Sequence, residues 1–114
     1  MSDYHQCDIW LSESAHHAQD GQRHKRPIVI ISSDKYNESN DEIICLHLTT
    51  RLDHENAISL IKSDFEKSHL VDDSAVRFDS ITRYSKNVLS KKLGEIKREK
   101  LRQIVAKTVE LIKT

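Results

Sequence analysis

The sequence contains few of the residues that interrupt regular structure, with two Gly and one Pro among 114 residues. This scarcity excludes collagen-like repeats and low-complexity linkers. Long hydrophobic runs are also missing: the longest, residues 28–31, is far shorter than the roughly 20 residues of a membrane-spanning helix. Residues 1–6 hold neither a basic region nor an apolar stretch, so we expect no secretory signal.

Cysteine is scarce as well, and its spacing indicates neither a redox site nor a metal site. Cys7 and Cys45 both lie in apolar stretches, so we expect reduced, buried thiols in a cytoplasmic protein. No C-x-x-C, H-x-x-x-H or H-E-x-x-H pattern is present, and the adjacent His16 and His17 point apart in extended chain. We therefore expect no metal and, without a glycine-rich phosphate motif, no nucleotide cofactor. His47, within a predicted strand, is interpreted as a partly buried packing residue.

No charge of one sign dominates, since 18 Lys and Arg balance 18 Asp and Glu. This balance excludes a strongly basic nucleic-acid coat and an acidic tail protein. Acidic residues nevertheless prevail between positions 34 and 79, and basic ones from position 91 onward. A basic cluster at residues 23–26 leads directly into an apolar segment, and such a local cluster can bind a short anionic strand. The basic face of the C-terminal segment is interpreted instead as a solvated helix surface.

What is present is a series of short apolar segments followed by one amphipathic segment. Strands are predicted at residues 8–11, 28–31, 43–49, 57–61 and 74–81. Residues 12–25 are expected to form an exposed loop, and residues 33–37 a turn or one helical turn.

The last segment has the spacing of an amphipathic helix from about residue 97. Its apolar stripe is predicted to consist of Leu101, Ile104, Val105, Thr108 and Ile112. Strands followed by one helix in so short a chain predict a single domain over residues 1–114. We expect it to be mainly β, a strongly bent antiparallel sheet or barrel with a C-terminal helix.

Four residues beside the predicted strands have the chemistry to handle a phosphate. Arg26 precedes one strand and Thr49 ends another, while Arg77 and Asp79 share one face of a third. Metal-free RNA cleavage needs a base for the ribose 2′-OH, cations for the phosphorane and an acid for the departing 5′-oxygen. Arg77 and Asp79 can supply charge stabilisation and a proton acceptor, although their spacing is more often that of a simple salt bridge on a strand.

Several short motifs, taken in order, resemble the PemK/MazF family of toxin endoribonucleases. The letters DIWL at residues 8–11 look like the family's opening strand, and QRHKRPIVI at residues 22–30 look like its Q-x-G-x-R-P strand entry. Leu48 and Thr49 match the end of the third strand, and VRFD at residues 76–79 matches the V-R-x-D of the Kid-like branch. KLG at residues 92–94, followed by the helix, completes a resemblance that covers nearly the whole chain.

The resemblance implies an SH3-like or CcdB-like antiparallel β-barrel with a C-terminal helix, working as a homodimer. It implies a toxin of a type II toxin–antitoxin system that cleaves single-stranded RNA without metal, leaves a 2′,3′-cyclic phosphate, and so inhibits translation and growth. It also implies a cognate antitoxin whose disordered tail covers the RNA groove.

The resemblance further implies roles for individual residues. Arg77 would be the acid and phosphorane stabiliser, and Asp79 the base or part of it. Arg26 would be a phosphate contact or acid, and Thr49 the hydroxyl that steadies the scissile phosphate. Residues implied in RNA binding are Arg23, Lys25, Arg83, His24 and His17.

The chain departs from the family pattern at three places. The His that assists catalysis in the Kid-like branch falls at Asp20, within residues 13–21, which replace the family's D-P-T-x-G-x-E loop. The substitutes available from the same loop are His16, His17 and His24. The family's Q-x-R-T reads SITR at residues 80–83, which moves an RNA contact to Arg83, and Cys7 stands where Gly often precedes the first strand.

Two other functions are consistent with the sequence. A gyrase-poisoning toxin would share the barrel and the helix, but residues 109–114 offer Ile112 and no aromatic side chain to plug a target. A catalytically inactive nucleic-acid-binding or antitoxin-binding module would bind RNA without cleaving it.

Overall fold

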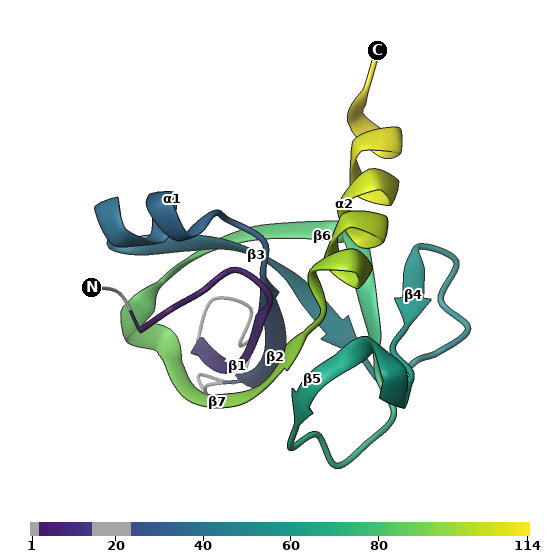
Figure 1. The fold of residues 1–114 in the computed structure, drawn as a ribbon, viewed down its shortest axis with the longest axis horizontal. Helices are drawn as coiled ribbons and strands as arrows, with labels where there is room; N and C mark the ends of the chain where they lie inside the picture. The colour runs from purple at the N-terminus through teal and green to yellow at the C-terminus, as the bar shows by residue number, and fades with distance from the viewer. Residues whose placement is uncertain (1–2, 15–23) are drawn as a thin grey trace.

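The computed structural model describes residues 3–14 and 24–114. Within these residues seven strands form one antiparallel sheet in the order β4-β6-β3-β2-β1-β7-β5, which curls strongly (Figure 1). The strands are β1 (Asp8–Ser14), β2 (His24–Ile30), β3 (Glu42–Thr49), β4 (Ala57–Ser59), β5 (Phe65–Ser68), β6 (Ala75–Ser85) and β7 (Leu89–Ile96). The helices are α1 (Asp34–Ser39), α2 (Arg98–Ile112) and two short 3₁₀ turns, Lys62–Asp64 and Lys86–Val88. The expected mainly β chain, with a bent antiparallel sheet and a C-terminal helix, is confirmed.

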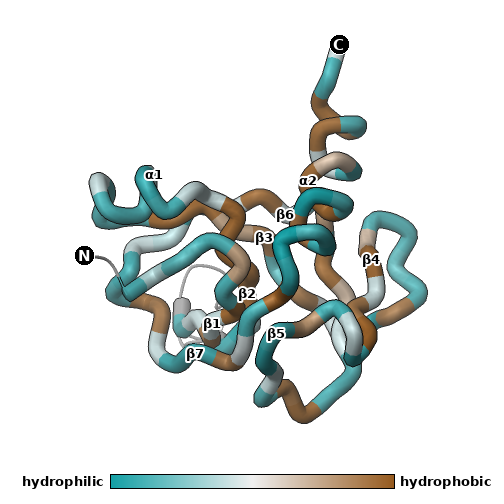
Figure 2. The backbone as a smooth tube through the Cα atoms, in the orientation of Figure 1, coloured by the Kyte–Doolittle hydropathy of each residue, from teal (hydrophilic) through white to brown (hydrophobic). Residues whose placement is uncertain are grey.

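Both faces of the central strand β3 are buried, so the sheet has two apolar clusters. One face packs beneath α2, where Leu46 and Leu48 of β3 join Leu101 and Ile104 of the helix. The other face carries the cluster Ile28, Ile30, Ile43, Cys45 and Leu89. Figure 2 shows the hydrophobic residues gathered along the strands, while α1 is largely hydrophilic. Alternation along β3 therefore sorts its side chains into an α2-facing set and an opposite set.

The strands predicted from the sequence are all present, with shifted ends. β1 extends to Ser14 and β6 to Ser85, whereas β4 ends at Ser59. The exposed loop expected at residues 12–25 is wrong at both ends, because residues 12–14 pair with residues 24–26 as strand. Residues 15–23 lie outside the described residues.

Strands β5 and β7 were missed by the sequence prediction. Their sequences, FEKS and LSKKLGEI, are too polar for a clear β pattern, and they form because each finds a backbone partner. β7 pairs with β1 on one side and β5 on the other. The approach at Gly94 is close: a Cβ there would lie 2.5 Å from the Lys67 carbonyl oxygen.

The C-terminal helix confirms the predicted segment but only part of its predicted stripe. Leu101, Ile104 and Thr108 are buried. Ile112 is 64% exposed, because α2 runs beyond the sheet that covers its first turns (Figure 1). Its assignment to the buried stripe is therefore wrong.

Both cysteines are free and buried, as the sequence predicted. Burial raises the pKa of Cys45 to about 12 and also raises the pKa of Cys7. Both thiols are therefore protonated at neutral pH and unreactive.

Candidate functional site

Strand β6 carries a large bulge where it passes β3. Leu48 pairs with Val76 and Leu46 pairs with Ile81, so residues 77–80 of β6 lie opposite a single residue of β3. We call residues 77–80 the β6 bulge. Bulges re-aim the side chains that they carry and are frequent beside active sites.

Backbone contacts from two other elements hold the middle of the β6 bulge. The Phe78 N–H donates to the Asn56 carbonyl oxygen at 3.0 Å, in the loop before β4, instead of to β3. The Thr108 hydroxyl of α2 donates to the Phe78 carbonyl oxygen at 2.6 Å. The side chain of Phe78 is buried beneath α2, so its neighbours Arg77 and Asp79 project from the opposite face of the sheet.

Arg77 and Asp79 form a two-pronged ion pair on the β6 bulge. The Arg77 Nε and Nη2 atoms donate to the two carboxylate oxygens of Asp79 at 3.1 and 2.8 Å. The two side chains are 32% and 23% exposed, so solvent still reaches them. The hydrogen bond from Arg77 lowers the pKa of Asp79, and the same bond raises the pKa of Arg77. At rest, Asp79 is thus a weaker base and Arg77 a weaker acid than the free side chains.

Arg26 and Thr49 lie on the same face of the sheet as the ion pair. The β2–β3 ladder ends at the pair Ile28 and His47, and alternation along each strand puts Arg26 on the face of Ile28 and Thr49 on the face of His47. Thr49 in turn pairs with Ala75, two residues before Arg77. Arg26 is exposed and Thr49 is half-buried. The four residues that the sequence predicted to handle a phosphate therefore project from neighbouring strands β2, β3 and β6 on one face.

His47 is buried, and its ring contacts three hydroxyl groups of β6. Its Nδ1 atom lies 2.7 Å from the Ser80 hydroxyl and 3.4 Å from that of Thr82, and its Nε2 atom lies 2.8 Å from the Tyr84 hydroxyl. The residue is 4% exposed, which confirms the predicted burial, and the hydroxyl groups give its ring polar partners. Burial raises the pKa of Tyr84, and the charge of Arg26 opposes that rise, which sets Arg26 near this network.

His54 is a second histidine near the site that the sequence did not single out. It lies close enough to Asp79 to contribute, after the Arg77 hydrogen bond, to the lowered pKa of that carboxyl. Its Nδ1 accepts a hydrogen bond from the Asn56 N–H at 3.0 Å, next to the contact that holds the β6 bulge. The only sequence signal was its position in the loop between two predicted strands.

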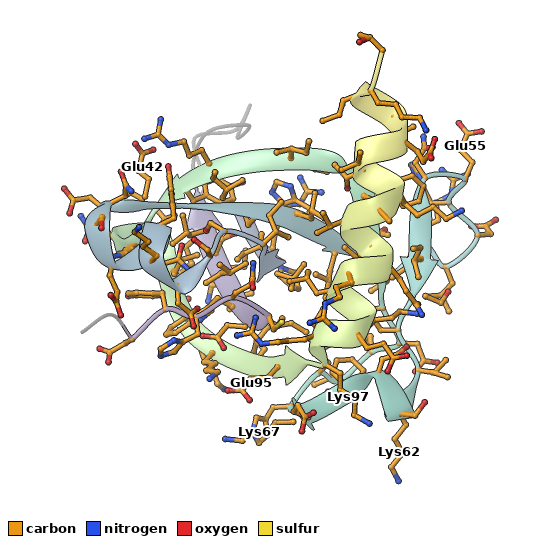
Figure 3. The ribbon with its side chains drawn as sticks, turned by 45° about the horizontal axis from the view of Figure 1, so that its top comes forward. Glu42, Glu55, Lys62, Lys67, Glu95 and Lys97 are labelled. Atoms are coloured by element: carbon orange, nitrogen blue, oxygen red, sulfur yellow. The ribbon has the colours of Figure 1, made fainter. Side chains whose placement is uncertain are left out.

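The predicted RNA-binding residues fall into three groups. Lys25 is exposed on β2 beside Arg26, and its Nζ lies 3.3 Å from Glu13. Arg83 pairs with Ile44 on the α2-facing side of the sheet, and its Nη2 lies 3.2 Å from Glu42. Figure 3 shows Glu42 at the α1 end, away from β4, so Arg83 is not brought together with Arg77.

The remaining predicted contacts belong to the segment between β1 and β2. His24 begins β2. Among the residues that the sequence singled out in this segment, those outside the described part of the chain are His16, His17, Asp20, Gly21 and Arg23.

Residues 3–14 and 24–114 contain neither a metal-binding cluster nor a membrane-spanning helix. No three His, Cys, Asp or Glu side chains in these residues are grouped so that they could hold a metal ion. None of the helices in the described chain is long and apolar enough to cross a membrane. A cavity of about 650 Å³ between β4 and β5, lined by Leu60, Phe65 and Leu70 among others, includes none of the candidate residues.

Comparison with known proteins identifies the family. Residues 5–112 match the model of the PemK-like, MazF-like toxins of type II toxin–antitoxin systems. Among solved structures, a MazE–MazF complex from Deinococcus radiodurans superposes with a TM-score of 0.80 at 17% identity, over 98% of this chain and 97% of that one. An endoribonuclease in complex with its cognate antitoxin, from a mycobacterial species, gives a TM-score of 0.72 at 18% identity, over 96% and 93% of the two chains. No curated protein sequence matches significantly. The family match spans nearly the whole chain and the structures share its fold, so this protein belongs to the PemK-like, MazF-like toxin family of type II toxin–antitoxin systems.

Proposed function

We infer that this toxin is an endoribonuclease that cleaves single-stranded RNA at a short sequence without a metal ion. The observation that supports it is the bidentate Arg77–Asp79 ion pair on the face of the sheet to which the positions of Arg26 and Thr49 also belong. A cation, a hydroxyl and a carboxylate are the groups that this chemistry needs.

The proposed reaction is an attack by the ribose 2′-oxygen on the adjacent phosphorus. Asp79, alone or with a partner, accepts the proton of the 2′-OH as the new P–O bond forms. The guanidinium groups of Arg77 and Arg26 stabilise the charge of the phosphorane, and Thr49 donates a hydrogen bond to a phosphate oxygen. The bond from phosphorus to the 5′-oxygen then breaks, an acid (Arg77 in this scheme) protonates that oxygen, and the products are a 2′,3′-cyclic phosphate and a 5′-OH.

In this scheme RNA binding must open the resting ion pair between Arg77 and Asp79. A phosphate competes with Asp79 for the Arg77 guanidinium, since both are bidentate oxygen acceptors. When the guanidinium turns to the phosphate, Asp79 loses the bond that lowers its pKa and becomes a better base. The substrate thereby activates the carboxylate that removes the proton from its 2′-OH.

RNA is held by basic residues of β2 and of the segment that precedes it. Lys25 and Arg26 are exposed there, and Arg23, His24 and His17 belong to the same stretch of sequence. Arg83 stays a predicted contact that lies apart from this group.

We also propose the partners that such a toxin requires. The related structures include complexes with the antitoxin, and a cognate antitoxin for this chain would cover the exposed face around Arg26 and the β6 bulge. The protein would work as a homodimer in the cytoplasm and stop growth by destroying messenger RNA.

The experiment is an incubation of the purified protein with a mixed-sequence RNA in EDTA. We expect discrete fragments that end in a 2′,3′-cyclic phosphate and begin with a 5′-OH. Bound but uncut RNA would show an inactive binding module instead. Intact RNA together with trapped gyrase–DNA complexes would favour the gyrase-poisoning alternative.

A further inference from the structure

Residue His47 is the single residue of β3 that the β6 bulge spans. Its neighbours Leu46 and Leu48 pair with Ile81 and Val76, so its own position has no regular backbone pair on β6. Its side chain makes the connection instead, with Nδ1 at 2.7 Å from the hydroxyl of Ser80, the last residue of the bulge. Ser80 directly follows Asp79 in the chain.

The imidazole ring itself is fixed from its other end. Nε2 lies 2.8 Å from the Tyr84 hydroxyl, and the two rings meet edge to face with centroids 5.6 Å apart. A neutral imidazole has one donor and one acceptor nitrogen, and hydroxyl groups such as those of Ser80 and Tyr84 satisfy either tautomer. In a residue that is 4% exposed, a ring bonded at both nitrogens has little freedom to move.

Three elements therefore hold three successive parts of the β6 bulge. The loop before β4 binds the Phe78 N–H, α2 binds the Phe78 carbonyl oxygen, and β3 binds the Ser80 hydroxyl through His47. The first two contacts fix Phe78, on the α2 side of the sheet. The third is a side-chain contact on the opposite face, where Arg77 and Asp79 project, and it comes from the strand that carries Thr49.

We propose that His47 is a positioning residue, which holds the β6 bulge through Ser80 and so keeps Arg77 and Asp79 in register with Thr49 and Arg26. This inference rests on the proposed ribonuclease function for its kinetic consequence, but the tether itself is a structural statement. His47 does not touch RNA in this scheme, because it is buried beneath Tyr84 and the strands. It acts on the rate of the chemical step and not on the affinity for RNA.

Two replacements of His47 test the contacts of its two ring nitrogens separately. An Asn side chain puts a polar atom near the position of Nδ1 and can still bond Ser80, whereas a Gln side chain reaches the position of Nε2 and Tyr84. Ser80→Ala removes the same tether from the other side and deletes one oxygen atom only. Tyr84→Phe is the matched control, because it removes the hydroxyl beside Nε2 of His47 and leaves the bond between Nδ1 and Ser80 in place.

The test measures steady-state cleavage of a short RNA and amide hydrogen exchange of residues 77–80 in the full-length variants. We expect His47→Gln and Ser80→Ala to lower kcat by about tenfold to a hundredfold, with KM unchanged and faster exchange of residues 77–80. His47→Asn and Tyr84→Phe should keep kcat close to the wild-type value.

The proposal is wrong if His47→Gln and Ser80→Ala keep the wild-type kcat, or if they lose activity while exchange of residues 77–80 is unchanged. It is also wrong if His47→Asn is as inactive as His47→Gln. Should His47→Gln not fold, Ser80→Ala decides alone. A wild-type protein that cuts no RNA refutes the proposed function, and exchange in Ser80→Ala then decides whether His47 holds the bulge.

Discussion

Cys7 adopts a backbone conformation that only glycine takes up readily. Its φ is 81°, the only positive value at a non-glycine position in the described chain. The conformation is held because its N–H donates to Ile30 at 2.9 Å and its carbonyl accepts from Ile96 at 3.0 Å, which joins β2 to β7. A side chain at such a φ costs about 1 kcal/mol.

Cys7→Gly should therefore be at least as stable as Cys7→Ala, the reverse of the usual order. Both variants lose the buried thiol, but only the alanine keeps the backbone strain. The control is Ala75→Gly on β6, where glycine should cost about 0.5–1 kcal/mol because the φ there is negative. Urea unfolding measures all three, and a Cys7→Ala protein clearly more stable than Cys7→Gly would contradict the account.

The Arg77–Asp79 pair should stabilise the fold in a pH-dependent way. Folding lowers the pKa of Asp79, so the contribution is complete above the ordinary carboxyl pKa of about 3.9 and disappears as the pH falls through the lower folded value. Asp79→Asn should cost about 0.5–1 kcal/mol at pH 7, since the pair is partly exposed, and nothing near pH 2. Urea unfolding at the two pH values tests this.

The chain contains a matched control for that pair. Arg51 and Asp53 have the same spacing and a 3.3 Å contact, but their side chains are 70% and 86% exposed. Asp53→Asn should leave the unfolding free energy unchanged at both pH values. An equal loss in Asp53→Asn and Asp79→Asn would mean that the geometry of the β6 bulge contributes nothing.

The spacing of residues along one strand predicted part of this site, and the pairing register between strands determined the rest. That Arg77 and Asp79 share a face follows from their separation by two positions. That Arg26 and Thr49 belong to the same face of the sheet depends on the register of β2 with β3, which no local pattern fixes. The partners of His47 are 33 to 37 positions away in the chain, so its burial could be predicted but its hydrogen bonds could not.

At the scale of elements, α2 supports the β6 bulge from the face opposite to Arg77 and Asp79. Its Thr108 hydroxyl donates to the Phe78 carbonyl oxygen at 2.6 Å in a buried setting. Thr108→Val keeps the shape of the side chain and leaves that carbonyl without this donor, which should cost about 1–3 kcal/mol. Thr108→Ser should restore most of it, and the exposed Thr50→Val should change stability by less than about 0.5 kcal/mol. Thermal or urea unfolding decides, and a Thr108→Val protein as stable as the wild type would contradict this role.

The elements that the sequence predicted are those whose apolar pattern is strong. β3 has apolar side chains on both faces, and α2 repeats its buried residues every three or four positions. β5 and β7 depend on backbone pairing with distant strands, and the β6 bulge depends on three elements that meet there. Such long-range pairings leave no trace in a short window of sequence.

At the scale of the whole molecule, a neutral protein carries a local basic site. Arg26 and Arg77 lie on the face opposite α2, whereas the basic residues of α2 lie on the other side of the sheet. Binding of single-stranded RNA should weaken with salt, and Arg26→Ala should reduce the slope of log K against log salt by about 0.7. Lys107→Ala, on the exposed side of α2, should leave the slope unchanged. Equal reductions by both variants would show that RNA does not select this face.

The central claim is that Arg77 and Asp79 cut RNA without a metal ion. The most direct measurement is the single-turnover cleavage rate of a target RNA in EDTA, for the wild type, Arg77→Ala and the control Arg51→Ala. We predict cleavage by the wild type and Arg51→Ala at the same rate, and a loss of about 100-fold or more in a folded Arg77→Ala protein. Cleavage by Arg77→Ala at the wild-type rate, or cleavage by any of the three only when Mg²⁺ is added, would contradict the account.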